Sequence, residues 1–303
     1  MGKLEIPGKL RPYVMAHRGN LVHCPENTLA AFQRAVDDGA DVIETDLHVT
    51  ADGHFVCIHD DAVDRTTNGR GAVRDMTLAE IKALSAGAGW PEYADERVPT
   101  LDEVFALVPD GVVVALELKA DDFLAPETGQ RLVATIAAAG RSDGVVLLSF
   151  TAARVQAVKR QGEAAGCDLP AGYITYTRLL PKGGVELLGP AWPLLFLNPL
   201  YVLMAHWRGQ PVCPLDPTPE KRLWYYKLLG CDAVLMVCQD SDALGVVCHF
   251  LNKKTAEENA LAEANWAQQY HTARFASLKG RGVNLQNIVY YRSTGAFSSA
   301  ATH

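Results

Sequence analysis

The sequence has no uninterrupted apolar stretch long enough to cross a membrane. Its most apolar run, residues 190–204, is broken by prolines and an asparagine, whereas a transmembrane helix needs about 20 mostly apolar residues. The N-terminal residues also lack the apolar centre of a secretory signal peptide. We therefore expect a soluble protein of the cytoplasm, with no transmembrane segment.

The chain also lacks paired cysteines and an excess of positive charge. None of the seven cysteines forms a CxxC pair, which argues against a thiolate zinc site. Cys57 and Cys238 stand in apolar runs, where cysteine usually acts as a small buried hydrophobe. The net charge is -7, whereas proteins that bind nucleic-acid backbones usually present a basic surface. These features predict no disulfide framework and no nucleic-acid partner.

Short apolar segments alternate with helix-like segments through most of the chain. Near-continuous apolar runs such as residues 112–116 are typical of strands buried on both faces of a parallel sheet. The predicted strands are residues 12–16, 41–48, 54–58, 112–118, 145–149, 171–176, 194–197, 211–215 and 232–237. Repeated strand–helix units over about 230 residues favour an α/β fold of the TIM (β/α)8 barrel type, with a doubly wound open sheet as the alternative.

Local signals mark where the predicted helices and turns begin. Asn27 or Thr28 can cap a helix over residues 28–38, and we interpret Asn27 as the cap. Asp52-Gly53 stands between two predicted strands and predicts a hairpin turn. Two capping-box patterns predict further helix starts, at residues 77–80 and 100–103.

Ionisable residues gather where four of the predicted strands end. Charged groups are unfavourable in a protein interior unless they are paired or bound to a metal. Because the carboxyl ends of barrel strands meet at one face, we expect these residues to form one site. The set comprises two histidines, two cations and three carboxylates: His17, Arg18, Glu44, Asp46, His59, Glu117 and Lys119.

The three carboxylates are candidate metal ligands. Strand residues two apart share a face, so Glu44 and Asp46 point the same way. With Glu117 they offer a set of oxygen ligands, which suits Mg²⁺ or Ca²⁺ better than zinc. The alternative is that these acids only form ion pairs with Arg18 and Lys119, and spacing alone leaves both readings open.

The histidines and cations suit cleavage of a phosphodiester. Such a reaction needs one group that accepts a proton and another that donates one, which two histidines could supply. Arg18 and Lys119 would bind the nonbridging phosphate oxygens. Two neighbours have alternative roles. His48 shares the strand face of the acids and could join the site, or could only mark the strand end before the turn. Asp60 could orient His59 or could be solvated beside Asp61.

A series of short motifs resembles the signature of the glycerophosphodiester phosphodiesterases. The resemblance spans roughly residues 11–245 and is dense only up to residue 150. The motifs occur in the order HRG at 17–19, PENT at 25–28, ADVIETD at 40–46, HD at 59–60, RTTNG at 65–69, VPTLDE at 98–103 and ELK at 117–119.

This resemblance implies a fold and a reaction. The fold would be a TIM barrel within residues 1–250, with a small insertion after the second strand at about residues 60–95. The reaction would release sn-glycerol 3-phosphate and an alcohol, by attack of the glycerol 2-hydroxyl and hydrolysis of a cyclic phosphate. His17 and His59 would act as acid and base, with a metal on the three carboxylates and phosphate on the two cations.

The second half of the chain departs from the family pattern. Relatives usually carry Trp-Thr on the seventh strand and Thr-Asp after the last, where this chain has Pro214-Leu215-Asp216 and Met236-Val237-Cys238. The alcohol side of the substrate is therefore open. One alternative is a lysophospholipase D-like lipid-headgroup hydrolase with an apolar cleft near Leu194-Leu195-Phe196. The other is a phosphodiester-binding barrel without turnover.

Residues 251–303 differ in composition from the barrel region. Residues 254–278 have few helix breakers and predict one polar, alanine-rich helix, followed by a frayed tail. We expect a helical extension that packs on the barrel or joins two copies of the chain. Its basic and aromatic residues leave contact with a membrane surface as the alternative.

Overall fold

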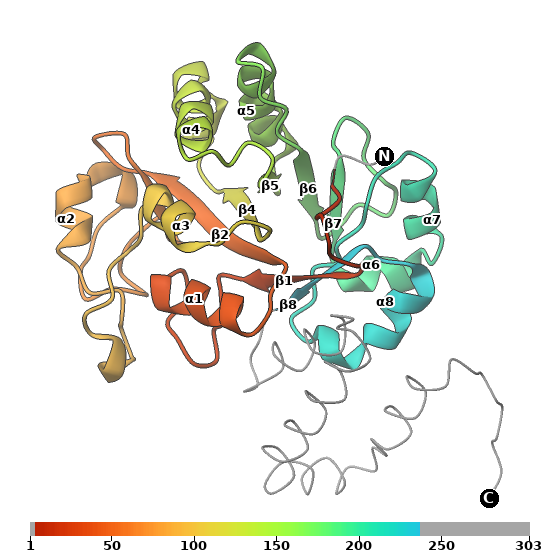
Figure 1. Ribbon diagram of the computed structural model, residues 1–303, viewed down its shortest axis with the longest axis horizontal. Helices are drawn as coiled ribbons and strands as arrows, with labels where there is room; N and C mark the ends of the chain where they lie inside the picture. Colours follow the sequence, from red (N-terminus) through yellow and green to blue (C-terminus); the bar gives the residue numbers. More distant parts are fainter. Residues whose placement is uncertain (1–3, 237–303) are drawn as a thin grey trace, which may run out of the picture. The chain divides into compact units, whose positions relative to one another are not determined.

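The computed structural model describes residues 4–236, and the predicted extension of residues 251–303 lies outside these described residues (Figure 1). Within them, one sheet has the strand order β7-β6-β5-β4-β2-β1-β8, and β3 pairs with β2 alone. The strands are β1 Tyr13–His17, β2 Val42–Val49, β3 Phe55–Cys57, β4 Val113–Leu118, β5 Val145–Ser149, β6 Ala171–Thr175, β7 Leu187–Pro190 and β8 Ala233–Met236.

A short extended segment, residues 211–215, closes this sheet into a barrel. The Cys213 N–H donates to the Leu188 carbonyl of β7 at 2.9 Å, and the Asp232 N–H donates to the Val212 carbonyl at 2.9 Å. The pairing with β7 is parallel, as are the pairings of the other strands except β3. The segment thus joins β7 to β8, and the predicted TIM barrel is confirmed.

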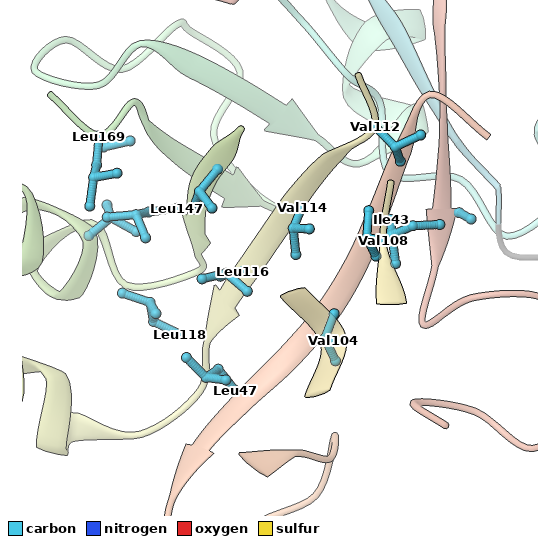
Figure 2. Close-up of a cluster of buried hydrophobic side chains, with 14 of the residues drawn as sticks. Ile43, Leu47, Val104, Val108, Val112, Val114, Leu116, Leu118, Leu147 and Leu169 are labelled. Carbon is cyan, nitrogen blue, oxygen red and sulfur yellow. The ribbon is translucent and has the colours of Figure 1, made fainter. Parts of the chain in front are cut away.

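Helices cover the outside of the barrel strands. Alternation along each strand sends one set of side chains out to these helices and the other into the barrel. Figure 2 shows the outward set as one buried cluster, in which Ile43 and Leu47 of β2 and Leu116 of β4 lie with Val104. The helices are α1 Leu29–Asp37, α2 Leu78–Lys82, α3 Leu101–Leu107, α4 Pro126–Ala138, α5 Ala152–Ala164, α6 Trp192–Leu197, α7 Tyr201–His206 and α8 Leu223–Leu229.

None of the helices described within residues 4–236 is long and apolar enough to cross a bilayer.

The insertion lies between β2 and α3, where the family resemblance implies it. The predicted hairpin turn is present, since β3 runs antiparallel to β2 and Gly53 has a φ of 86°. The capping box at Thr77 and Glu80 is also present and begins α2. A separate hydrophobic cluster holds the insertion together: Val56, Ile58, Val63, Val73, Ile81, Ala86 and Val98.

Two local predictions are wrong. Residues 194–197 are part of helix α6, and the strand at this point is β7. A short apolar run does not by itself distinguish a strand from a buried helix, and the glycine and proline of β7 read as strand breakers. Asn27 does not cap α1, because the Thr28 hydroxyl accepts the hydrogen bond from the Ala31 N–H.

Candidate active site

The strand register brings the seven predicted site residues together at the carboxyl end of the barrel. His17 at the end of β1 lies opposite Glu44 of β2, and Asp46 lies opposite Glu117 of β4. Six of the seven line one cavity of about 440 Å³, and the seventh, Asp46, is buried behind them. The predicted convergence of these residues is therefore present in the structure.

The turn after β1 holds Arg18 in an unusual conformation. Its φ is 54°, a left-handed conformation that is unfavourable by about 1–3 kcal/mol for most residues. The Arg18 N–H donates to Glu44 Oε2 at 3.0 Å, and Nη1 of its side chain donates to Glu26 Oε1 at 3.0 Å. Gly19 follows with a φ of 84°, and a Cβ there would lie 2.6 Å from the carbonyl carbon of Ala31. This turn is therefore fixed against α1 with the guanidinium over the site.

The three carboxylates form a buried cluster. Glu44, Asp46 and Glu117 each offer an oxygen, and these oxygens lie within 4.8 Å of one another. Asp46 is completely buried, and its Oδ2 lies 3.0 Å from Arg18 Nε. Lys119 Nζ lies 3.0 Å from Glu117 Oε1 and 3.4 Å from Asp46 Oδ1. Three negative charges thus face two positive charges.

The surroundings shift the pKa values of the three carboxylates in different directions. Burial and the neighbouring acids raise the pKa of Glu44 well above its usual value, and they also raise the pKa of Glu117. Burial acts in the same direction on Asp46, but Arg18 and Lys119 outweigh it and lower the pKa of that carboxyl. With all three carboxylates ionised the five groups carry a net charge of −1, and a divalent cation would offset the repulsion and turn that charge to +1. The donor set therefore fits a hard metal ion.

His17 is held in its neutral form. Its Nδ1 is buried and has no hydrogen-bond partner among residues 4–236. Burial and then the charge of Arg18 lower the pKa of His17 to about 3. The imidazole is therefore neutral at ordinary pH.

His59 is held by a chain of ion pairs that starts in the insertion. His59 Nδ1 lies 2.6 Å from Asp60 Oδ1, and Arg65 Nε donates to Asp60 Oδ2 at 2.6 Å. Arg65 Nη1 also donates to Glu26 Oε2 at 2.9 Å, and Glu26 contacts Arg18. The hydrogen bond from Arg65 is the main cause that lowers the pKa of Asp60. Asp60 therefore stays ionised and leaves Nε2 of His59 for the cavity.

Sequence reasoning missed part of this arrangement. Arg65 belongs to the RTTNG motif, but nothing in the sequence shows that it reaches both Asp60 and Glu26. Asn27 donates from Nδ2 to Asp46 Oδ2 at 2.9 Å, so it orients a carboxylate. His48 Nε2 lies 3.2 Å from the His59 carbonyl and supports the backbone there.

The rest of the cavity wall is apolar and comes from the second half of the barrel. Phe150 and Tyr176 stack with ring centroids 4.9 Å apart. Leu194 and Leu195, expected near an apolar cleft, are buried and do not line the cavity. Its apolar lining includes Leu148, Phe150, Ile174, Tyr176, Trp192 and Leu215.

The chain is similar to known proteins of one family. Residues 17–166 match the model of the glycerophosphoryl diester phosphodiesterase family. A glycerophosphodiester phosphodiesterase of Caldanaerobacter subterraneus is 46% identical over 153 residues, which cover 50% of this chain and 63% of that protein. A Mycobacterium tuberculosis protein named "Probable glycerophosphodiester phosphodiesterase 1" is 35% identical over 66% of this chain and 80% of its own length.

A solved structure shares the fold. An Oleispira antarctica phosphodiesterase in complex with sn-glycerol-3-phosphate superimposes with a TM-score of 0.64 and 28% sequence identity. The match covers 75% of this chain and 93% of that one. The chain spans less than two thirds of the length of the Caldanaerobacter relative.

Arg65→Ala tests the chain of ion pairs. We expect turnover of a glycerophosphodiester to fall about 10-fold to 100-fold, because Asp60 and Glu26 lose the group that orients them. Arg65→Lys should recover only part of the loss, since an ammonium cannot bridge two carboxylates as a fork does. The melting temperature should change little, because Arg65 is half exposed. Arg70→Ala, an exposed arginine of the same insertion, is the control. A kcat equal to wild type in Arg65→Ala would contradict this role.

Glu44→Gln tests the carboxylate cluster through stability. A carboxyl whose pKa is raised by folding stabilises the protein at low pH, and that stability is lost as pH rises through the raised pKa. The metal-free wild type should therefore lose stability as pH rises through the raised pKa values of Glu44 and Glu117. Added Mg²⁺, Ca²⁺ or Mn²⁺ should restore it.

Thermal unfolding with and without metal, across pH, measures both effects. Glu44→Gln should flatten the pH dependence and weaken the metal response, whereas the exposed Glu163→Gln should behave as wild type. A wild-type metal response in Glu44→Gln would remove this residue from the ligand set.

Proposed function

Because this chain belongs to the glycerophosphodiester phosphodiesterase family, we propose that it hydrolyses glycerophosphodiesters to sn-glycerol 3-phosphate and an alcohol. One observation carries the proposal: three buried carboxylates, two cations and two histidines converge on one cavity. This set matches what the reaction requires, namely charge stabilisation at phosphorus together with proton uptake and delivery.

The carboxylates would hold the metal, which we propose to be Mg²⁺ or Ca²⁺. Glu44, Asp46 and Glu117 are its ligands in this proposal. When bound, such an ion polarises a phosphoryl oxygen and stabilises negative charge at phosphorus. Arg18 and Lys119 then need no longer neutralise the carboxylates alone, and they bind the nonbridging oxygens of the phosphodiester.

The histidines would divide the proton transfers between them. His17, which is neutral, accepts the proton of the glycerol 2-hydroxyl as its oxygen forms a bond to phosphorus. His59, oriented by Asp60, donates a proton to the leaving alcohol oxygen as its bond to phosphorus breaks. Water then opens the cyclic phosphate with these two roles reversed, which yields sn-glycerol 3-phosphate.

The apolar wall favours a second candidate substrate. Phe150, Tyr176 and Trp192 line the same cavity as the charged groups, and the described lining residues from β5 to β8 and their loops include no acidic side chain. A lysophospholipid would place its acyl-bearing group there, as in the lysophospholipase D-like alternative. Parallel assays on glycerophosphocholine and on micellar lysophosphatidylcholine distinguish the two candidate substrates. Only lysophosphatidylcholine carries an acyl chain that can contact the apolar wall.

Histidine variants test the mechanism. His17→Ala and His59→Ala should each lower the rate of sn-glycerol 3-phosphate release by at least ~10²-fold, because each loses a proton-transfer step. His54→Gln, an exposed histidine of the β2–β3 hairpin, serves as the control. If either alanine variant kept the wild-type rate, that histidine would have no part in proton transfer.

Metal removal tests the cofactor. EDTA should abolish turnover of glycerophosphocholine and glycerophosphoethanolamine, and added Mg²⁺, Ca²⁺ or Mn²⁺ should restore it. Turnover that persists in EDTA would refute the metal requirement. A protein that binds the diester but never cleaves it, with any metal, would support the binding barrel instead.

A further inference from the structure

Large apolar side chains are exposed on one side of the barrel. Twelve large hydrophobic residues are exposed within residues 4–236, and all but Leu10 and Leu124 lie between residues 176 and 228. Leu197, Trp207 and Leu228 are more than two thirds exposed, at 71%, 77% and 74%. Isolated exposed leucines are common in proteins, but a concentration of this kind marks an interaction surface.

Ten of these residues lie in neighbouring elements, which we call the apolar face. The face comprises α6, α7 with its flanking residues Leu200 and Trp207, α8 and the loop of residues 176–180. Figure 1 shows the three helices on the same side of the barrel. The ring of Phe196 in α6 stacks on Tyr225 of α8 at 4.3 Å, and Tyr225 contacts Trp224 at 5.6 Å. The Asn198 side chain donates to the Leu179 carbonyl at 2.8 Å and ties the loop to the end of α6.

The apolar face begins at the mouth of the cavity. Tyr176 of the loop and Trp192 of α6 both line the cavity. Trp192 also contacts Phe196 edge to face at 5.7 Å, and Phe196 is exposed on the apolar face. A surface bound to this face would therefore lie next to the entrance of the active site.

The charge of this region is opposite to that of the whole chain. Residues 176–229 carry six lysines and arginines against three acids, whereas the chain has a net charge of -7. Two of the three acids, Glu186 and Asp216, are ion-paired with Lys159 and Arg222. Exposed leucine and tryptophan among basic residues is the composition of surfaces that bind the interface of anionic membranes.

We propose that the apolar face docks on the surface of an anionic phospholipid bilayer. Tryptophan and leucine side chains enter the interfacial region, while the basic residues meet the lipid phosphates. A symmetric dimer through this face is disfavoured, because it would bring two positively charged surfaces together. The proposal goes beyond the hydrolysis proposed above, because it does not depend on which phosphodiester is cleaved.

Vesicle sedimentation with the full-length chain tests the proposal. Vesicles of phosphatidylcholine with phosphatidylglycerol should bind the protein at least ~10-fold more tightly than vesicles of phosphatidylcholine alone. Added salt should weaken binding, because it screens the attraction between the basic residues and the lipid. Absence of binding to both kinds of vesicle would overturn the proposal.

A matched pair of variants locates the surface. Leu197→Ser, Trp224→Ser and Leu228→Ser combined should weaken binding at least ~10-fold, because three interfacial side chains are lost. Leu10→Ser with Leu124→Ser, the two exposed leucines elsewhere, should bind as wild type. Circular dichroism and turnover of a soluble glycerophosphodiester should stay unchanged in both variants.

Two results would overturn the assignment of this surface. The first is wild-type vesicle binding by the triple variant. The second is a wild-type dimer, seen by light scattering, that the triple variant converts to a monomer, because the face would then belong to a second copy of the chain.

Discussion

The compensation of the buried charge on Asp46 is the constraint on which the rest of the site depends. A carboxylate with no exposed surface is tolerated only where cations and donors surround it. Arg18 from the end of β1, Asn27 from the start of α1 and Lys119 from the end of β4 supply them. One charge therefore draws side chains from three chain segments, and two of these residues, Arg18 and Asn27, have positive φ angles.

The same strand serves both the core and the site. Along β2, Ile43 and Leu47 pack outward in the cluster of Figure 2, while Glu44 and Asp46 point into the barrel. A shift of one residue in the pairing of β2 would turn the two carboxylates out toward the helices and would turn Ile43 and Leu47 into the cavity. Packing of the outward side chains thus holds the carboxylates in register. The stability of the fold and the geometry of the carboxylate cluster therefore depend on the same strand pairing.

The sequence was enough to predict those features that follow from strand periodicity and strand ends. Glu44, Asp46 and Glu117 could be assigned to one site because alternation and barrel topology leave few other arrangements. Arg65 could not, because its partners come from separate loops that only the folded insertion brings together. The apolar run at residues 194–197 was ambiguous for a different reason, since burial, and not backbone preference, decides between strand and helix there. Residues 237–303 are not described, so the predicted extension stays a prediction.

The two halves of the barrel contribute different kinds of side chain to the cavity. The charged groups that line it lie on, or directly after, the strands β1 to β4, whereas β5 to β8 and their loops supply the apolar wall apart from Met15 of β1. The family match at residues 17–166 covers the charged half and ends before β6. In the sheet the two halves pair where β4 meets β5 and where β1 meets β8, and their inward apolar side chains pack in one cluster inside the barrel. The register of the carboxylates therefore depends on backbone pairing among β1, β2 and β4, and not on which apolar side chains form the opposite part of the cavity.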